Sequence, residues 1–335
     1  MTVINVDIKK DTFWDRNKKS GGYLFRKKAT EVTVSICRFI LLFGLCFLIL
    51  QPVLNKISVS FMTEEDLFDP IVISIPVHFT SANYTLAAEI MNYKQGFINS
   101  LVISLTTSLV QIAMCTLVGY GFARFKFPLK KLWFAFVMLV IVIPPQVISN
   151  SLFLSFRFFD ILGIVKLLNH GEALNLRGSI IPYYLMCFGC MGLKDGLYIY
   201  MIRQFFRNIP VDMEEAAYVD GCGMFRTFVT IMLPEAKPII TSCFLFSFVW
   251  QWTDGFYSRM FLGTTTLVST SISRIVDSLA AYMQRILGVT VTISQAYSNC
   301  ILSTGTLMVV GPVLILYLFA QRQFVESISS SGIKM

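Results

Sequence analysis

Charged residues are scarce in this sequence, and histidine is scarcer still. Asp, Glu, Lys and Arg make up 14% of the 335 residues, against about a quarter in ordinary soluble domains, whereas hydrophobic residues make up 55%. Only two histidines occur, His78 and His170, and both lie outside the apolar runs. A metal-ligand cluster or a Ser–His pair therefore cannot be assembled inside those runs, and we expect no catalytic residue and no metal site.

Motifs for nucleotide hydrolysis and for common hydrolases are also absent. The sequence contains no G-x-x-x-x-G-K-[ST] phosphate-binding loop and no G-x-S-x-G nucleophile motif. No apolar run carries the ladder of arginines that is typical of a voltage sensor. We therefore expect this chain to be neither an ATPase nor another enzyme, and to bind no cofactor of its own.

Long apolar runs are what the sequence does contain. Six runs are each close to the 20 residues that an α-helix needs to cross a bilayer core. No internal repeat or low-complexity linker separates them, so we predict an all-α membrane protein with one membrane domain over residues 33–320. The six predicted transmembrane helices cover residues 33–54, 99–122, 132–154, 179–201, 238–258 and 299–320.

Lysine and arginine fall mainly on one side of these helices. The N-terminal segment 1–32, the loops 123–131 and 202–237 and the tail 321–335 together hold eighteen of them, and the other three loops hold eight. Positive charge collects on the cytoplasmic side of membrane proteins, so both termini are predicted to be cytoplasmic. The anionic inner leaflet accounts for the net charge of +8, and no nucleic-acid partner is expected.

A charged, glycine-containing loop separates the fourth and fifth apolar runs, at 202–237. Its centre reads EEAAYVDGCGMFRTFVTIMLPEAKP, residues 214–238. Asp212 is predicted to cap a first helix, because Glu215 follows it at the spacing of a capping box. Gly221 is predicted to end that helix in a left-handed conformation, which costs glycine little.

The same loop predicts a second short helix. Met213, Ala216 and Ala217 would share one flat face of the first helix, which another surface could approach closely. A helix over 222–232 would follow and would stop at Pro234, which lacks the backbone donor that a helix interior needs. The loop is therefore predicted to form a compact helix–turn–helix knob on the cytoplasmic side.

The spacing within the knob resembles a known signature. Seven positions carry the resemblance: Glu215, Ala216, Ala217, Gly221, Ile231, Leu233 and Pro234. They resemble the EAA motif of permease subunits from binding-protein-dependent ABC importers. Further stretches resemble the carbohydrate branch of that family, the maltose-like oligosaccharide permeases, and the likeness covers most of residues 80–335. These stretches are FINSLVISLTTSLVQIAMCTLVGYGFARFKFP (97–128), VIPPQVISNSLFL (142–154), YMIRQFFRNIPVDMEEAAYVDGCG (200–223), FVWQWTDGFYSRMFL (248–262) and FAQRQFVESISSSGIKM (319–335).

The resemblance implies a type I ABC importer permease fold and a role for the knob. In that family the EAA loop is the coupling helix, which docks on the ATPase subunit. Taken alone, Glu215 would be no more than a helix cap and Gly221 no more than a helix end. The residues that the resemblance assigns to coupling are Glu214, Glu215, Ala216, Ala217, Asp220, Gly221, Ile231, Leu233 and Pro234.

The resemblance also implies partners and a location. A second homologous permease subunit, two ABC ATPase subunits that bind ATP and Mg, and an extracytoplasmic sugar-binding protein would complete the importer. The chain would be a multi-pass protein of the bacterial cytoplasmic membrane, in contact with the lipid bilayer. The sequence does not name the sugar.

Polar residues within the apolar runs are candidates for a substrate path, since such residues are costly in a membrane and are often functional. Pro144 and Pro145 predict a kink in the third helix, beside two of the candidates. The tryptophans could equally form an interfacial aromatic belt, and Lys194 with Asp195 could equally serve structure or gating. The full candidate set is Gln146, Asn150, Lys194, Asp195, Trp250, Gln251, Trp252, Asp254 and Tyr257.

Two other functions are compatible with an apolar chain. A secondary transporter or channel subunit would need no ATPase, but it would usually show a repeat or an intramembrane ion site, and the sequence shows neither. An intramembrane enzyme would need a nucleophile and a base, which are lacking. The sequence therefore favours an importer permease that translocates a carbohydrate, with an oligosaccharide as the expected substrate, driven by a partner's ATP hydrolysis.

Overall fold

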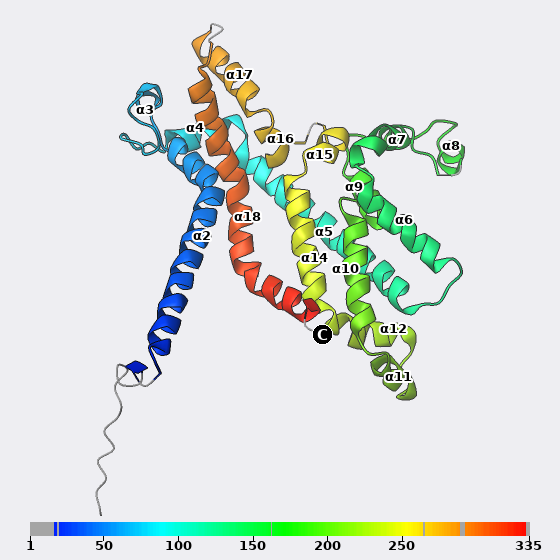
Figure 1. Cartoon of the computed structure of the whole chain (residues 1–335). Coiled ribbons are helices and arrows are strands. Elements are labelled where there is room, and N and C mark those ends of the chain that lie inside the picture. The colour runs from blue at the N-terminus through cyan, green and yellow to red at the C-terminus, as the bar shows by residue number, and fades with distance from the viewer. Residues whose placement is uncertain (1–16, 19, 162, 264, 289–291, 333–335) are drawn as a thin grey trace, which may run out of the picture.

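The chain is described by a computed structural model that covers residues 17–18, 20–161, 163–263, 265–288 and 292–332. Regular structure in these residues is helical, and β pairing there is limited to two isolated bridges, Met62 with Phe79 and Phe159 with Leu174. The predicted all-α class is confirmed for the described residues (Figure 1). Parts of the predicted N-terminal segment and tail, residues 1–16, 19 and 333–335, lie outside them.

Three helices are long and apolar enough to cross a membrane. They are α2 (Tyr23–Ser60), α5 (Tyr93–Arg124) and α18 (Gln295–Gly332), and in α18 the apolar part is Gln295–Gln321. They contain the first, second and sixth predicted spans. At 1.5 Å per residue, the 38 residues of α2 extend about 57 Å, well beyond a bilayer core of about 30 Å.

The third predicted span is kinked, as its proline pair predicted. It consists of α6 (Lys130–Val142) and α7 (Pro145–Arg157), whose axes differ by 102°. Pro145 opens α7, where its missing N–H breaks no hydrogen bond of that helix.

The fourth predicted span, 179–201, is not one continuous helix. It divides into α9 (Ile181–Phe188) and α10 (Asp195–Asn208), separated by six residues. Two of those residues, Cys190 and Lys194, have positive φ angles of 53° and 65°, which a continuing helix does not allow. Glycine at positions 189 and 192 weakens the helix at the same place.

The fifth predicted span ends earlier than expected. Its helix, α14 (Lys237–Thr253), stops at Asp254, and a separate short helix, α15 (Phe256–Phe261), follows. The described residues thus hold three membrane-length helices, or five spans if each bent helix pair is counted as one. This count does not confirm the six predicted transmembrane helices, and the fourth of them is a broken helix in the structure.

Short helices lie at both ends of this bundle. One end carries the loop helices that precede α5 and α18, and the opposite end carries α11 and α12 (Figure 1). The start of α2 and the end of α18 lie at the same end as α11 and α12 (Figure 1). The loop helices are α3 (Glu64–Phe68), α4 (Ala82–Ile90), α8 (Ile164–Leu168), α16 (Val268–Ile272) and α17 (Ile275–Leu287).

The centre of the molecule is formed by α5, α10 and α14. A buried apolar cluster that includes Ile112, Cys115, Tyr198 and Ile202 holds these helices together. At Gly119, α5 lies close to α10, because a Cβ there would stand 2.9 Å from the Ile202 side chain. Small residues at such positions let membrane helices pack closely.

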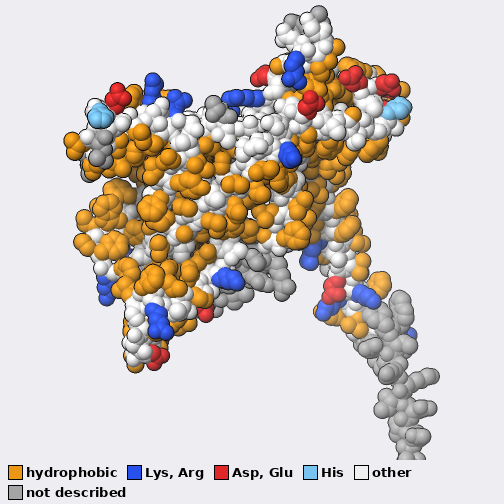
Figure 2. All heavy atoms as spheres, turned by 180° about the vertical axis from the view of Figure 1, so that it is seen from behind, with side chains coloured by type: hydrophobic (Ala, Val, Ile, Leu, Met, Phe, Trp, Pro, Cys, Tyr) orange, Lys and Arg blue, Asp and Glu red, His pale blue; other side chains and the backbone are white. Residues whose placement is uncertain are grey.

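By contrast, the apolar window of α2 lies outside the packed core, although the end of this helix contacts α18. None of the 18 residues in its apolar window is buried inside the chain. Seen from behind, hydrophobic side chains form a broad band across the molecule, and charged side chains gather mainly at its two ends (Figure 2). This distribution suits a bilayer around the band and leaves α2 to contact lipid or another subunit.

Candidate functional site

The knob is defined here as α11 (Asp212–Val219), the turn that follows it, and the helical run Met224–Glu235. Asp212 does not cap α11, because Val211 already has helical angles and no side chain caps the helix. The carbonyl of Val211 instead accepts the backbone N–H groups of Glu214 and Glu215, at 2.9 and 3.1 Å. The predicted capping box is therefore wrong, since the helix begins one residue earlier than a cap at Asp212 requires.

The turn of the knob has the geometry predicted for it. Gly221 has a φ of 80°, and its N–H donates to the carbonyl of Tyr218 at 3.1 Å. The N–H of Cys222 donates to the carbonyl of Ala217 at 2.9 Å. This pair of hydrogen bonds is a Schellman motif, and it sets the angle at which the chain leaves α11.

Pro234 does not stop the second helix of the knob. The helical run continues to Glu235, through α12 (Met224–Thr227), a π-helical turn (Phe228–Met232) and α13 (Leu233–Glu235). The prediction of a stop is wrong because the turn before Pro234 widens, and a wider turn accommodates both the ring and the missing donor.

A buried ion pair ties the knob to the rest of the chain. Glu214 is 5% exposed, and its Oε1 lies 3.1 Å from Nε of Arg124, the last residue of α5. Arg124 also donates from Nη2 to the carbonyl of Ile209 at 2.7 Å, just before the knob begins. Because both side chains are largely buried, the contact fixes α11 against the end of a membrane-length helix.

The outer surface of the knob differs from the predicted flat face. Ala217 is buried beside Glu214, whereas Ala216 and Glu215 are exposed, so the two alanines do not form one exposed face. Large apolar side chains are exposed instead, above all Val219 at 88% and Phe225 at 77%. Among the remaining coupling candidates, Asp220, Gly221 and Pro234 are exposed, and Ile231 and Leu233 are half-buried.

A second candidate site lies where two membrane helices are broken. A pocket of about 390 Å³, here called the break pocket, is bounded by the α6–α7 kink and by the break between α9 and α10. Three predicted path residues line it: Gln146, Lys194 and Tyr257. The Lys194 ammonium lies 5.0 Å from the centroid of the Trp250 ring, which is close enough for a cation–π contact.

Asp195 does not line the break pocket but lies behind it, in a buried polar cluster. It is fully buried where α5, α10 and α14 meet, and it accepts a hydrogen bond from Nε2 of Gln111. The backbone N–H of Gly192 donates to its other oxygen at 2.5 Å. Ser247 and Gln251 both donate to Oε1 of Gln111, at 2.5 and 3.3 Å.

This Asp195 cluster was only partly visible from the sequence. Asp195 and Gln251 were predicted as path residues, whereas Gln111 and Ser247 were not. The available signal for Gln111 was its position as a lone amide within an otherwise apolar or small-residue run. Its side chain also donates to the carbonyl of Leu193 at 2.8 Å, and so satisfies backbone that the helix break exposes.

Trp252 and Asp254 serve the packing of the chain. Trp252 is 1% exposed, and its Nε1 donates to the carbonyl of Val309 in α18 at 3.0 Å. The Asp254 carboxylate accepts three backbone N–H groups at the start of α15 and the hydroxyl of Tyr183 at 2.5 Å. Neither residue lines the break pocket, and Asn150 is an exposed residue of α7 that also lies outside its lining.

Comparison with known proteins identifies the family. Residues 115–328 match the family described as binding-protein-dependent transport system inner membrane component. A probable ABC transporter permease protein from Pyrococcus horikoshii is 32% identical over 56% of this chain and 62% of its own length. The maltodextrin transport system permease protein of Streptococcus pneumoniae is 23% identical over 88% of this chain and 94% of its own. The diacetylchitobiose uptake system permease protein of Streptomyces coelicolor is 26% identical over 84% and 83%.

A solved structure shows that the fold is shared as well. A bacterial ABC transporter involved in the import of the acidic polysaccharide alginate matches with a TM-score of 0.59 at 16% identity, over 88% of this chain and 97% of the matched chain. The family match covers more than half of the chain and confirms the resemblance seen in the sequence. The chain belongs to the binding-protein-dependent transport system inner membrane components, the permease family of ABC transporters.

Proposed function

We propose that the chain is one permease subunit of an ATP-driven importer that carries a carbohydrate across the bacterial cytoplasmic membrane. Two ATPase subunits holding ATP and Mg, a second permease and an extracytoplasmic sugar-binding protein would complete the importer. Relatives named for maltodextrin and diacetylchitobiose support a sugar, and the family name supports a binding protein.

The observation that carries this proposal is the knob. It combines the EAA spacing with an exposed apolar tip and with a buried ion pair, Arg124–Glu214, that leads directly into α5. An ATPase surface that grips Val219 and Phe225 would thus move a helix of 32 residues, because α11 cannot swing without breaking that pair. Exposed Glu215 is free to meet a cation of the ATPase.

The arrangement also supports six membrane crossings with both ends on the knob side. Four crossings would be α2, α5, α14 and α18, and the other two would be the broken pairs α6–α7 and α9–α10. The exposed apolar length of α2 supports a lateral contact with the second permease.

The break pocket is the proposed part of the substrate path. It joins an amide, an ammonium and a phenol, from Gln146, Lys194 and Tyr257, with the Trp250 ring close to Lys194. Sugars bind to aromatic faces and to planar polar groups, so this set suits a saccharide in passage. Two broken helices can also change their relative angle more easily than two continuous ones.

The coupling role is tested with two variants in the assembled importer in proteoliposomes. Gly221→Val places a β-branched residue at a φ of 80°, and Glu215→Ala removes an exposed charge. We expect both to assemble with the ATPase and to hydrolyse ATP without driving uptake. Gly221→Asn is the control, because asparagine tolerates the left-handed region and should keep uptake. Full uptake by both test variants would contradict a coupling role.

The rival function is tested with the chain alone. Vesicles that hold this chain without any ATPase should show no sugar uptake, with or without ATP. Uptake at the rate of the full importer would instead establish a secondary transporter or channel.

A further inference from the structure

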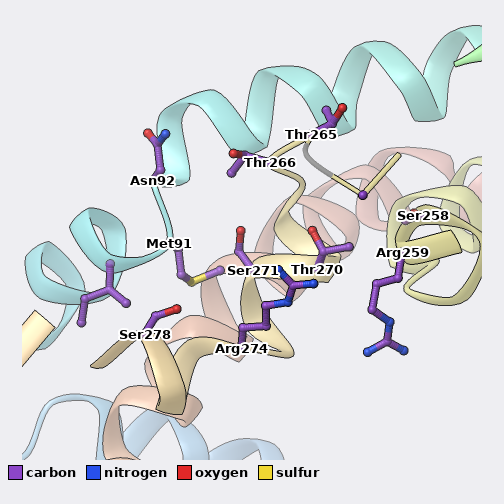
Figure 3. Close-up of a pocket in the computed structure, with 12 residues that line it drawn as sticks. Met91, Asn92, Ser258, Arg259, Thr265, Thr266, Thr270, Ser271, Arg274 and Ser278 are labelled. Carbon is purple, nitrogen blue, oxygen red and sulfur yellow. The ribbon is translucent and has the colours of Figure 1, made fainter. Parts of the chain in front are cut away.

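A polar pocket lies at the end of the molecule opposite the knob. It encloses about 240 Å³ between the start of α5, the loop that follows α15, and the helices α16 and α17 (Figure 3). Its lining includes two arginines, Arg259 of α15 and Arg274 beside α17, and no acidic residue. We call it the arginine pocket.

Neither arginine is neutralised by the chain itself. Among the described residues, no carboxylate forms an ion pair with Arg259 or Arg274. The acidic residue nearest to Arg259 along the chain, Asp254, is committed to the backbone of α15 and to Tyr183. Asp277 lies three residues after Arg274 in the first turn of α17, but it forms no ion pair with Arg274 among the described contacts. Two exposed guanidinium groups therefore face one cavity without an anion, an arrangement that favours a bound oxyanion.

Hydroxyl groups converge on the same cavity. Thr265, Thr266 and Ser271 line it, and their side-chain hydroxyls form no hydrogen bond within the described chain. Thr270 and Ser271 lie next to the Arg274 side chain in Figure 3. Such hydroxyls suit a ligand that carries hydroxyls of its own, because each can both donate and accept.

We infer that the arginine pocket binds one anionic sugar unit, that is, a sugar carrying a carboxylate or a phosphate. The guanidinium groups would bind the oxyanion, and the free hydroxyls would bind the sugar ring. The volume suits one ring rather than a chain of several. This inference deepens the proposed function by naming a charged substrate class. It rests on the proposed function for the claim that the bound sugar is a transport substrate, whereas binding itself can be measured without it.

The test measures binding to the full chain in lipid nanodiscs without nucleotide. Radiolabelled glucuronate, glucose 6-phosphate and glucose are the probes, with acetate and inorganic phosphate as competitors. We expect at least one anionic sugar to bind about tenfold more tightly than glucose, since a charge-assisted hydrogen bond is worth about that factor. Glucuronate and glucose 6-phosphate as separate arms show which oxyanion is preferred.

Variants then assign the binding to the pocket. Arg259→Gln and Arg274→Gln should each weaken the anionic sugar about tenfold and leave glucose unchanged. Arg285→Gln is the matched control, because Arg285 also belongs to α17 but does not line the pocket. Thermal unfolding of each variant shows whether it is folded. If a glutamine variant does not fold, Arg259→Lys, which keeps the charge, provides a second measurement of binding at this position.

Three results would overturn the inference. The first is that charged and neutral sugars bind equally, or that none of them binds. The second is that both arginine variants bind the anionic sugar as the wild type does. The third is that acetate or phosphate displaces the probe as effectively as the sugars do, which would indicate an adventitious ion only. The proposed function would survive all of them, because ATP-driven uptake of a neutral sugar is measured separately.

Discussion

Replacing Arg124 with glutamine should release the knob from the membrane helices. The Arg124 side chain is 9% exposed and the Glu214 side chain 6%, so the two charges are paired in a site from which water is largely excluded. The variant leaves the Glu214 carboxylate buried and without its cation. Removing one member of a buried pair costs about 3–5 kcal/mol, far more than the loss of a surface pair.

The expected cost is local rather than global. The pair holds α11, while the cluster around Tyr198 and Ile202 holds the central helices without it. A local destabilisation of about 3–5 kcal/mol raises the open population of the knob by about two to four orders of magnitude. The double variant Arg124→Gln with Glu214→Gln buries no charge, and it should therefore recover most of the lost stability.

Limited proteolysis of the assembled importer measures this opening. Cleavage within residues 209–223 should be much faster in Arg124→Gln than in the wild type, and close to wild type in the double variant. Arg226→Gln is the matched control, because Arg226 is an exposed residue of the knob with no ion pair among the described contacts. Cleavage of Arg124→Gln at the wild-type rate, or no recovery in the double variant, would refute the reasoning.

Three further predictions follow from contacts elsewhere. Gly196→Ala should lower the free energy of unfolding by about 1–3 kcal/mol, because the added Cβ would meet backbone and side-chain atoms of α6 at 2.8 Å. Gly121→Ala is the control and should leave stability unchanged, since the nearest atom to its Cβ is 3.8 Å away. Chemical denaturation in detergent compares the two variants. Trp252→Phe should cost at least about 0.5–1.5 kcal/mol by removing the hydrogen bond from the indole N–H to the Val309 carbonyl of α18, and the same measurement checks it. The pair Asp66–His78 should hold its loop most firmly at mildly acidic pH: the hydrogen bond and charge of Asp66 raise the pKa of His78, so this stabilisation is complete below about 6.5 and is lost as pH rises through the raised pKa. Burial opposes ionisation of Asp66, but hydrogen bonds from His78 and the backbone hold its pKa below the usual value, so the contribution of Asp66 is lost only as pH falls through that lowered pKa. The rate of proteolysis within residues 61–80, divided by the rate in Asp66→Asn at the same pH, should therefore be lowest between the two shifted pKa values. A rate ratio that does not change with pH would contradict this prediction.

The sequence predicted what depends on apolar length and on backbone constraint. Runs of about 20 apolar residues gave α2, α5 and α18, and a proline pair gave the bend between α6 and α7. Gly221 was predicted correctly because its left-handed turn is a local property that few other residues tolerate. Such signals need no knowledge of distant contacts.

The remainder depended on contacts between segments far apart in the chain. The break before Asp195 is stable because the Gln111 side chain, 84 residues away, donates to the Leu193 carbonyl and to the Asp195 carboxylate. A hydropathy profile cannot predict such a contact. The inward orientation of Glu214 likewise depends on Arg124. For the same reason, the sequence alone predicts Trp252 and Asp254 as substrate contacts, whereas in the structure their polar groups bond to α18 and α9.

The two interrupted helices have a consequence for the membrane itself. At the break pocket, residues 143–144 and 191–194 bring non-helical backbone from two segments together. Hydrocarbon tails cannot satisfy those peptide groups, so side chains of the protein must separate them from lipid. A bilayer around this chain would therefore be sealed at this place by the fit of a few side chains, among them Lys194, and a looser fit there would let ions leak across it.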